Sequence, residues 1–311
     1  MIMTKLKALL LAGVAVLATG AHAQNITLAS GPSGGTWYPL GAALAKIIEE
    51  EIPGVRVSVV NGVTVANILG TNAGQYDLAM SLSTSNVDAM KGGSDPFGDA
   101  QENIRGIVGF YSAPYQMAVP ESSDIQTIAD FKGKVINPGV VGGATDVLTR
   151  KILEINGLSF DDMARVERLS YSDASMQLKD GHLDVFTGIL SIPAGAIAEA
   201  ALGNGVRMIP LTDDTIAKLQ EENDGFITVM IPGGTYNGQE SDVQAVGTNN
   251  VLIANANLDP ALVEKITGAI VKNAERLHDV NAALTGFSRE TAAVGIGAPL
   301  HPGAKAYFDA N

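Results

Sequence analysis

The chain carries the same pattern of glycine-rich loop and turn twice, about a hundred residues apart. Gly34-Gly35-Thr36 is matched by Gly142-Gly143-Ala144-Thr145, and each loop is followed by a Gly-x-x-Asp turn, at 74–77 and at 181–184. The distance from the loop threonine to the turn glycine is 38 residues in the first copy and 36 in the second. Matched spacing of this kind predicts two related α/β units that close on a small ligand bound at their loops.

The first 23 residues have the features of a secretory signal peptide, which is removed from a mature protein. Lys5 and Lys7 provide the positive start, an apolar run follows at 8–18, and Ala21-His22-Ala23 is a small-x-small cleavage site. The chain has no cysteine, so it lacks the residue that anchors a bacterial lipoprotein. We therefore expect a soluble periplasmic protein that is not embedded in the membrane.

Length and composition indicate how many hydrophobic cores the chain can form and which binding partners its charge disfavours. The part after residue 23 is longer than one core normally organises, and 46% of the chain is hydrophobic, which is enough to fill two. The formal net charge of −13 makes nucleic acid and anionic lipid poor partners. We predict a monomer with two lobes.

Strands and helices alternate along both units. In the first, strands are expected at 26–30, 55–60 and 77–82, with helices running to about Glu51 and over 65–72. The scheme repeats from Lys134 to Leu190, and connections of this length imply mostly parallel sheets. Further strands are expected at 104–110 and 115–119, then at 226–231 and 250–254 on the return path, and a long helix at 259–280. We assign 24–113 plus 229–311 to lobe I and 114–228 to lobe II, with the ligand cleft between them.

The predicted helix starts are candidate anion sites. A helix start exposes about four unpaired amides and a partial positive charge, and glycine lets an anion approach the backbone. The starts at Thr36, Thr64, Ser85 and Thr145 follow parallel strands, where open α/β sheets bind ligands. The two loop threonines are also expected to act as N-caps.

Several kinds of chemistry are disfavoured. No Gly-Lys-Ser/Thr follows a glycine loop and no G-x-G-x-x-G opens a helix, so a nucleotide site is not expected. His182, His278 and His301 stand apart, so we predict no metal, and no G-x-S-x-G elbow or cysteine offers a nucleophile. Asp77 and Asp184 recur in equivalent turns, which favours a structural role over a paired-carboxylate site.

A family resemblance covers essentially the whole chain after residue 23. It is carried by the segments Ile26–Gly31, Gly35–Gly41, Gly62–Asn67, Gln75–Ala79, Phe131–Lys134, Gly188, Ile231–Gln239 and Pro299–Ala304. Together these resemble the TAXI-type solute receptors of tripartite ATP-independent periplasmic (TRAP) transporters. The second loop departs from the family's Gly-x-Gly-Thr-Glu, since it reads Gly142-Gly143-Ala144-Thr145-Asp146.

The resemblance implies a type II periplasmic binding protein fold, in which two α/β lobes close around a small carboxylate. It implies a ligand such as glutamate, 2-oxoglutarate or a similar dicarboxylate, no cofactor, and delivery to TRAP membrane permease subunits without ATP hydrolysis. The ligand-binding residues that we predict are Gly35, Thr36, Trp37, Tyr38, Thr64, Asn67, Ser83, Ser85, Gly143, Ala144, Thr145 and Gly188.

Two alternatives remain at this point. The receptor of an ATP-driven (ABC) importer would have the same fold and would differ only in its membrane partner. A dehydratase-like enzyme on this fold would need an acid/base pair with a shifted pKa in the cleft, and the sequence offers no obvious pair. We therefore predict a receptor and not an enzyme.

Overall fold

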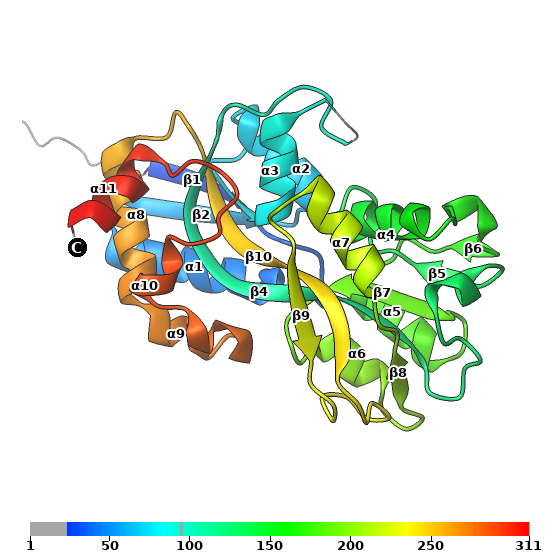
Figure 1. The fold of residues 1–311 in the computed structure, drawn as a ribbon. Helices are drawn as coiled ribbons and strands as arrows, with labels where there is room; N and C mark the ends of the chain where they lie inside the picture. Colours follow the sequence, from blue (N-terminus) through cyan, green and yellow to red (C-terminus); the bar gives the residue numbers. More distant parts are fainter. Residues whose placement is uncertain (1–23, 94–95, 311) are drawn as a thin grey trace, which may run out of the picture.

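The computed structural model describes residues 24–93 and 96–310, so the predicted signal peptide lies outside the described residues. Two α/β lobes lie side by side and share two long strands, β4 (Ile104–Pro120) and β10 (Val243–Asn255), which run through the middle of the molecule (Figure 1). No helix in the described part is both long enough and apolar enough to cross a membrane. The predicted α/β fold class is confirmed, with a mixed central sheet flanked by helices.

Lobe I is built on the strand order β2-β1-β3-β10-β4. β1 (Gln24–Ala29) pairs in parallel with β2 (Val55–Val60) and β3 (Leu78–Leu82), whereas β10 is antiparallel to β3 and β4. The connecting helices are α1 (Trp37–Glu51), α2 (Thr64–Asn72) and α3 (Ser83–Lys91). The chain ends on this lobe with α8 (Pro260–Lys272), α9 (Ala274–His278), α10 (Arg289–Ala292) and α11 (Pro302–Ala310).

The sheet of lobe I is buried on both faces because alternate residues of each strand enter different cores. In β3, Leu78 and Met80 pack with α1 and α8, while Ala79 packs on the opposite face with α2 and α3. β10 does the same, since Leu252 joins the first core and Val251 the second. This two-sided burial explains the continuous apolar runs in these strands.

Lobe II continues the same sheet as β4-β7-β5-β6, with β8 on β4 and β9 on β10. Its strands are β5 (Val135–Asn137), β6 (Arg165–Val166), β7 (Val185–Ile189), β8 (Val206–Met208) and β9 (Ile227–Ile231). Its helices are α4 (Ala144–Ile155), α5 (Tyr171–Lys179), α6 (Gly195–Ala200) and α7 (Asp213–Glu222).

The two Gly-x-x-Asp turns make equivalent contacts in the two lobes. The Asp77 carboxylate accepts a hydrogen bond from the Thr27 amide at 2.8 Å, and the Asp184 carboxylate accepts one from the Val135 amide at 2.7 Å. In each case the aspartate directly precedes one strand and binds an amide of the parallel neighbour, within β1 in the first lobe and at the start of β5 in the second. The structural role expected for these aspartates therefore agrees with their contacts.

Three details differ from the expected elements. The strands expected at 104–110 and 115–119 form one strand, which passes through Pro114 where β4 leaves β10 and begins to pair with β7. The expected helix at 259–280 breaks at Asn273, whose side chain donates to the Ala269 carbonyl at 2.8 Å. The third lies after residue 229, the predicted return to lobe I: Ile231 and Ala245 pack in one core with Phe186 of the predicted lobe II, and the lobe bounds stay a prediction.

His301 is a buried titratable group in lobe I that makes stability depend on pH. The residue is 0% exposed, its Nδ1 accepts from the Gly303 amide at 3.2 Å, and burial lowers the pKa of the imidazole. An unfolded histidine has a pKa of about 6.5, so below that pH the unfolded chain binds a proton that the folded chain resists. Stability should therefore fall as the pH drops below about 6.5, by up to about 1.4 kcal/mol per pH unit.

This prediction is checked by urea unfolding between pH 8 and pH 5. His301→Asn keeps an acceptor near the position of Nδ1 but does not titrate, so the variant should lose less stability on acidification than the wild type. Parallel pH profiles for the two proteins would contradict the prediction.

Candidate ligand-binding site between the lobes

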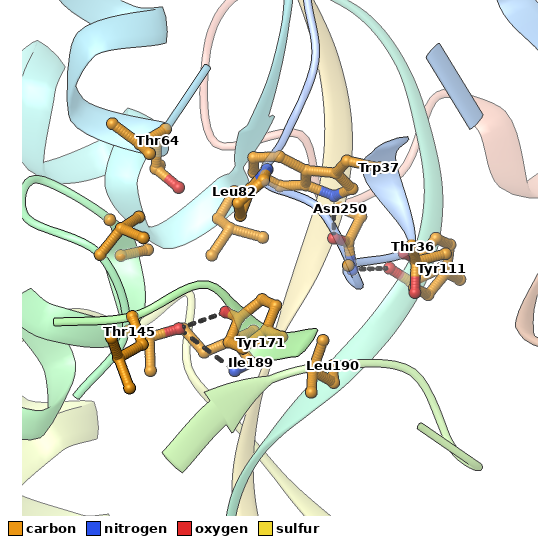
Figure 2. Close-up of a pocket in the computed structure, with 17 residues that line it drawn as sticks. Thr36, Trp37, Thr64, Leu82, Tyr111, Thr145, Tyr171, Ile189, Leu190 and Asn250 are labelled. Atoms are coloured by element: carbon orange, nitrogen blue, oxygen red, sulfur yellow. Dashed lines mark hydrogen bonds between the residues drawn. The ribbon is translucent and has the colours of Figure 1, made fainter. Parts of the chain in front are cut away.

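A cavity that is partly open to solvent lies where the two lobes meet, and both lobes supply its wall (Figure 2). The space open to the centre of a water-sized sphere is about 50 Å³, equivalent to roughly three to five water molecules. The lining residues of lobe I are Pro32, Gly35, Thr36, Trp37, Val63, Thr64, Leu82, Tyr111 and Asn250. Those of lobe II are Val140, Gly143, Ala144, Thr145, Leu169, Tyr171, Ile189 and Leu190.

The N-termini of α1, α2 and α4 meet at this cavity, because Trp37, Thr64 and Ala144 are the first residues of these helices and all three line it. No side chain among the described residues caps the first turn of any of them. The backbone amides of Thr64 and Thr145 likewise have no acceptor within the described part of the chain. The cavity wall therefore offers unpaired N–H groups and a positive dipole potential.

The lobe I wall is held rigid by a polar chain on β10. Trp37 Nε1 donates to Asn250 Oδ1 at 2.6 Å, and Asn250 Nδ2 donates to the Tyr111 carbonyl at 3.2 Å. Asn250 is only 3% exposed, so its amide is committed to these two contacts. This arrangement fixes the indole ring as an apolar side of the cavity.

The lobe II wall has a matching polar contact. The hydroxyls of Thr145 and Tyr171 are 2.7 Å apart, and Thr145 Oγ1 also accepts from the Ile189 amide at 3.3 Å (Figure 2). These bonds tie the start of α4 to β7 and α5. Because the Thr145 hydroxyl already has two protein partners, it serves the wall more than a ligand.

Thr64 differs from the other hydroxyl residues of the cavity. Its side chain is 4% exposed, and its hydroxyl has no hydrogen-bond partner within the described part of the chain. Figure 2 shows the Thr64 oxygen turned toward the space between the lobes. The oxygen is open to the cavity and has no partner among the described residues to compete with a ligand, so this group is available to bind one.

The cavity wall is electrically neutral. Among the described residues that line it, none is Asp, Glu, Lys, Arg or His. Burial raises the pKa of Tyr111 and of Tyr171, so both hydroxyls remain protonated at neutral pH. Within the described ranges, no group of three or more acidic or histidine side chains is placed to hold a metal ion. The wall can therefore bind through hydrogen bonds, dipoles and apolar contact.

Direct bonds between the lobes close the cavity. The Val65 amide of α2 donates to the Gly142 carbonyl of lobe II at 3.0 Å. On another side Ser191 of lobe II is 3.1 Å from the Thr36 hydroxyl and accepts from Asn281 at 3.2 Å. The described conformation is thus a closed one, in which both lobes touch around the site.

Of the residues predicted from the sequence, the structure brings seven to the cavity wall. They are Gly35, Thr36, Trp37, Thr64, Gly143, Ala144 and Thr145. Their assignment as ligand contacts remains a prediction. All seven lie at or next to helix starts, and the glycines and threonines of the preceding loops mark such positions in the sequence.

Tyr38, Ser83 and Ser85 do not line the cavity. Tyr38 is 51% exposed, because the first turn of α1 carries it away from the site that Trp37 faces. Ser83 accepts from the Asn249 amide at 3.1 Å and therefore joins α3 to β10. Ser85 lies beside a smaller hollow next to the cavity.

Asn67 and Gly188 do not line the cavity either. Asn67 is fully buried, and its amide donates to the carbonyls of Ser30 and Met80 at 2.8 Å each, so it joins α2 to β1 and β3. Gly188 lies in β7 beneath Leu190, whose Cδ1 is 2.8 Å from the position of an added Cβ. Gly188 makes room for a wall residue without reaching the cavity.

The sequence interpretation missed several wall residues, of which Tyr111, Tyr171 and Asn250 are the polar ones. Asn250 immediately precedes the apolar run 251–254 within a buried strand, and a buried amide in that position was an available signal. Tyr111 and Tyr171 gave no comparable signal, because they reach the cavity only through the crossing of β4 and the docking of α5.

Two α/β lobes with a small cavity between them define the solute-binding-protein fold, and solved structures of that class are similar to this chain. A putative L-cystine ABC transporter protein from Listeria monocytogenes has a TM-score of 0.53 and 15% identity over 86% of this chain and 99% of its own. The alkanesulfonate-binding protein SsuA from Xanthomonas axonopodis pv. citri, bound to MOPS, has a TM-score of 0.50 and 17% identity. The match covers 93% of this chain and 84% of that protein. A Streptococcus mutans structure described for glutathione import via GshT has a TM-score of 0.52 and 15% identity. The match covers 85% of this chain and 96% of that chain. At these identities the likeness concerns the fold alone.

Residues 28–310 match the model of the NMT1-like family, so the chain belongs to the NMT1-like family. The narrower resemblance to TAXI-type receptors receives no support from this match or from the similar folds.

Proposed function

We propose that this protein is a periplasmic solute receptor that captures a small organic anion by closure of its two lobes and delivers it to a membrane importer. The observation that carries the proposal is the cavity between the lobes, at which the uncapped N-termini of α1, α2 and α4 meet. Helix N-termini favour negative charge, and a site that both lobes complete couples binding to closure.

An ATP-driven importer is the better-supported membrane partner. Two of the similar structures belong to ABC transport systems by name, one for L-cystine and the other for glutathione and cystine. A TRAP permease remains the alternative implied by the sequence resemblance. Reconstitution of the receptor with its permease in liposomes separates the two, since uptake that requires ATP hydrolysis supports the ABC partner and uptake driven by an ion gradient alone supports TRAP.

An enzymatic role has less support from the cavity. General acid/base catalysis needs a titratable side chain with a pKa near the working pH. The titratable groups on the described cavity wall are the tyrosines 111 and 171, and burial raises the pKa of each away from neutrality. Turnover of any bound compound would contradict a receptor function.

A thermal-shift screen tests the proposed function. A ligand that binds only the folded state at a thousandfold excess over its Kd stabilises the protein by about 4 kcal/mol, which raises Tm by several degrees. We expect this shift with carboxylates or sulfonates and not with sugars or nucleotides. A shift caused by a sugar or a nucleotide, with none from any organic anion, would overturn the assignment.

A further inference from the structure

The charge balance of the cavity restricts the anion further than the fold does. Three helix N-termini each contribute about half a unit of positive charge, so together they match on the order of one negative charge. The described wall has no lysine, arginine or histidine to match a second one. A second carboxylate would therefore be buried without a partner, which proteins avoid.

The wall is equally unsuited to an ammonium group. Asp146 follows the wall residue Thr145, but its carboxylate faces two arginines: Arg168 Nε lies 3.1 Å from one oxygen and Arg150 3.8 Å from the other. Both guanidinium groups also contact the Phe160 ring, at 5.0 Å for Arg168 and 5.8 Å for Arg150. This acid is thus already neutralised by its own neighbours, and the amino group of an α-amino acid would have no acidic partner in the cavity.

The rest of the wall favours an apolar body. Trp37, Leu82, Leu169 and Leu190 present hydrocarbon surface from both lobes. The Thr64 hydroxyl has no hydrogen-bond partner within the described part of the chain, and it lies at the N-terminus of α2, beside the unpaired Thr64 amide. One charged end held at the helix N-termini and one apolar end against these side chains would satisfy both kinds of surface.

We propose that the ligand is a compact organic monoanion, a carboxylate or sulfonate with an apolar body, and neither a dicarboxylate nor an α-amino acid. The inference rests on the proposed function and narrows its ligand class. It departs from the glutamate-type ligand that the sequence resemblance implied, because the residues that close the cavity carry no charge to match a second ionic group.

Calorimetric titration with matched compounds tests the inference. Monocarboxylates of three to six carbons, with the corresponding sulfonates, are compared with diacids, 2-amino acids and amides of the same chain length, such as butanoate, succinate, 2-aminobutanoate and butanamide. We expect the best monoanion to bind at least tenfold more tightly than its diacid, amino-acid and amide counterparts. The diacid measures the effect of a second negative charge, and the amino acid measures the effect of an added positive charge. The amide shows whether binding needs a charge at all.

The outcomes separate the two proposals. Equal or tighter binding by a diacid, an amino acid or an amide overturns the monoanion inference but leaves the receptor function intact, and so does binding by none of the monoanions while glutamate or 2-oxoglutarate binds. Binding by no organic anion of any kind overturns the receptor proposal itself. Preferential binding of one monoanion supports both.

Discussion

Replacing Thr64 by aspartate should weaken the binding of an organic anion by about a hundredfold and leave the fold intact. Thr64 is 4% exposed at the first residue of α2, and its hydroxyl is turned into the cavity. For the Coulomb energy we take a separation of about 5 Å between that carboxylate and the bound anion. At an effective dielectric constant of about 20, two like charges at that distance repel by roughly 3 kcal/mol, which is about two decades in Kd.

Asparagine at the same position provides the matched control. Asp and Asn have similar volumes, and both are favourable at a helix N-terminus, so the pair differs in charge alone. We expect Thr64→Asn to stay within tenfold of the wild type when the anion that gives the largest thermal shift is titrated at pH 8. Equal losses in both variants would show that shape and not charge matters at Thr64, and unchanged binding in Thr64→Asp would remove α2 from the site.

Replacing Gly34 by alanine should reduce affinity by about thirtyfold by keeping the lobes apart. Gly34 lies in the loop before α1 of lobe I, and a Cβ added there would be 2.8 Å from the Ser172 amide of α5 in lobe II. The two backbones would have to separate, which breaks bonds between the lobes such as Thr36 to Ser191. Loss of about two hydrogen bonds that depend on closure corresponds to roughly 2 kcal/mol.

The variant Gly54→Ala is the control that distinguishes a loss of lobe closure from the effect of backbone strain. Gly34 and Gly54 have nearly the same left-handed conformation, with φ of 81° and 86°, but a Cβ at Gly54 meets nothing within 4 Å. Both substitutions should lower stability by about 1 kcal/mol, and only Gly34→Ala should weaken binding. Trp37 emission on titration gives a second measure of closure, because the indole lines the cavity. Equal affinities for the two variants would contradict a role for this contact in closure.

Most predicted elements with a local signal agree with the structure, although neither Thr36 nor Thr145 caps its helix and the helix expected at 259–280 breaks at Asn273. Glycine loops, helix periodicity and the repeated turn aspartates lie within short segments, and Asp77 and Asp184 make the same bond in each lobe. Other predictions are wrong where contacts with residues distant in sequence determine the extent of an element. The strands expected at 104–110 and 115–119 are one strand, β4, because the chain continues through Pro114 while its pairing changes from β10 to β7.

The candidate site divides in the same way. The sequence alone placed Gly35, Thr64 and Thr145 at helix starts, since those starts follow from residues next to them in the chain. The tertiary structure alone determined that Asn250 holds Trp37 and that the Tyr171 hydroxyl contacts Thr145 on the cavity wall.

The sequence by itself thus determined the two α/β units, their loops and the dipoles at their helix starts, because periodicity, glycine and turn chemistry act over a few residues. Only the tertiary structure decided which side chains face one another across the lobes and that no charged side chain on the described wall joins them. The physical reason is that a cavity is formed by surfaces from strands and helices distant in sequence. The sequence pattern shows which face of a helix or strand a residue occupies, but it does not show which residues of other elements lie opposite that face.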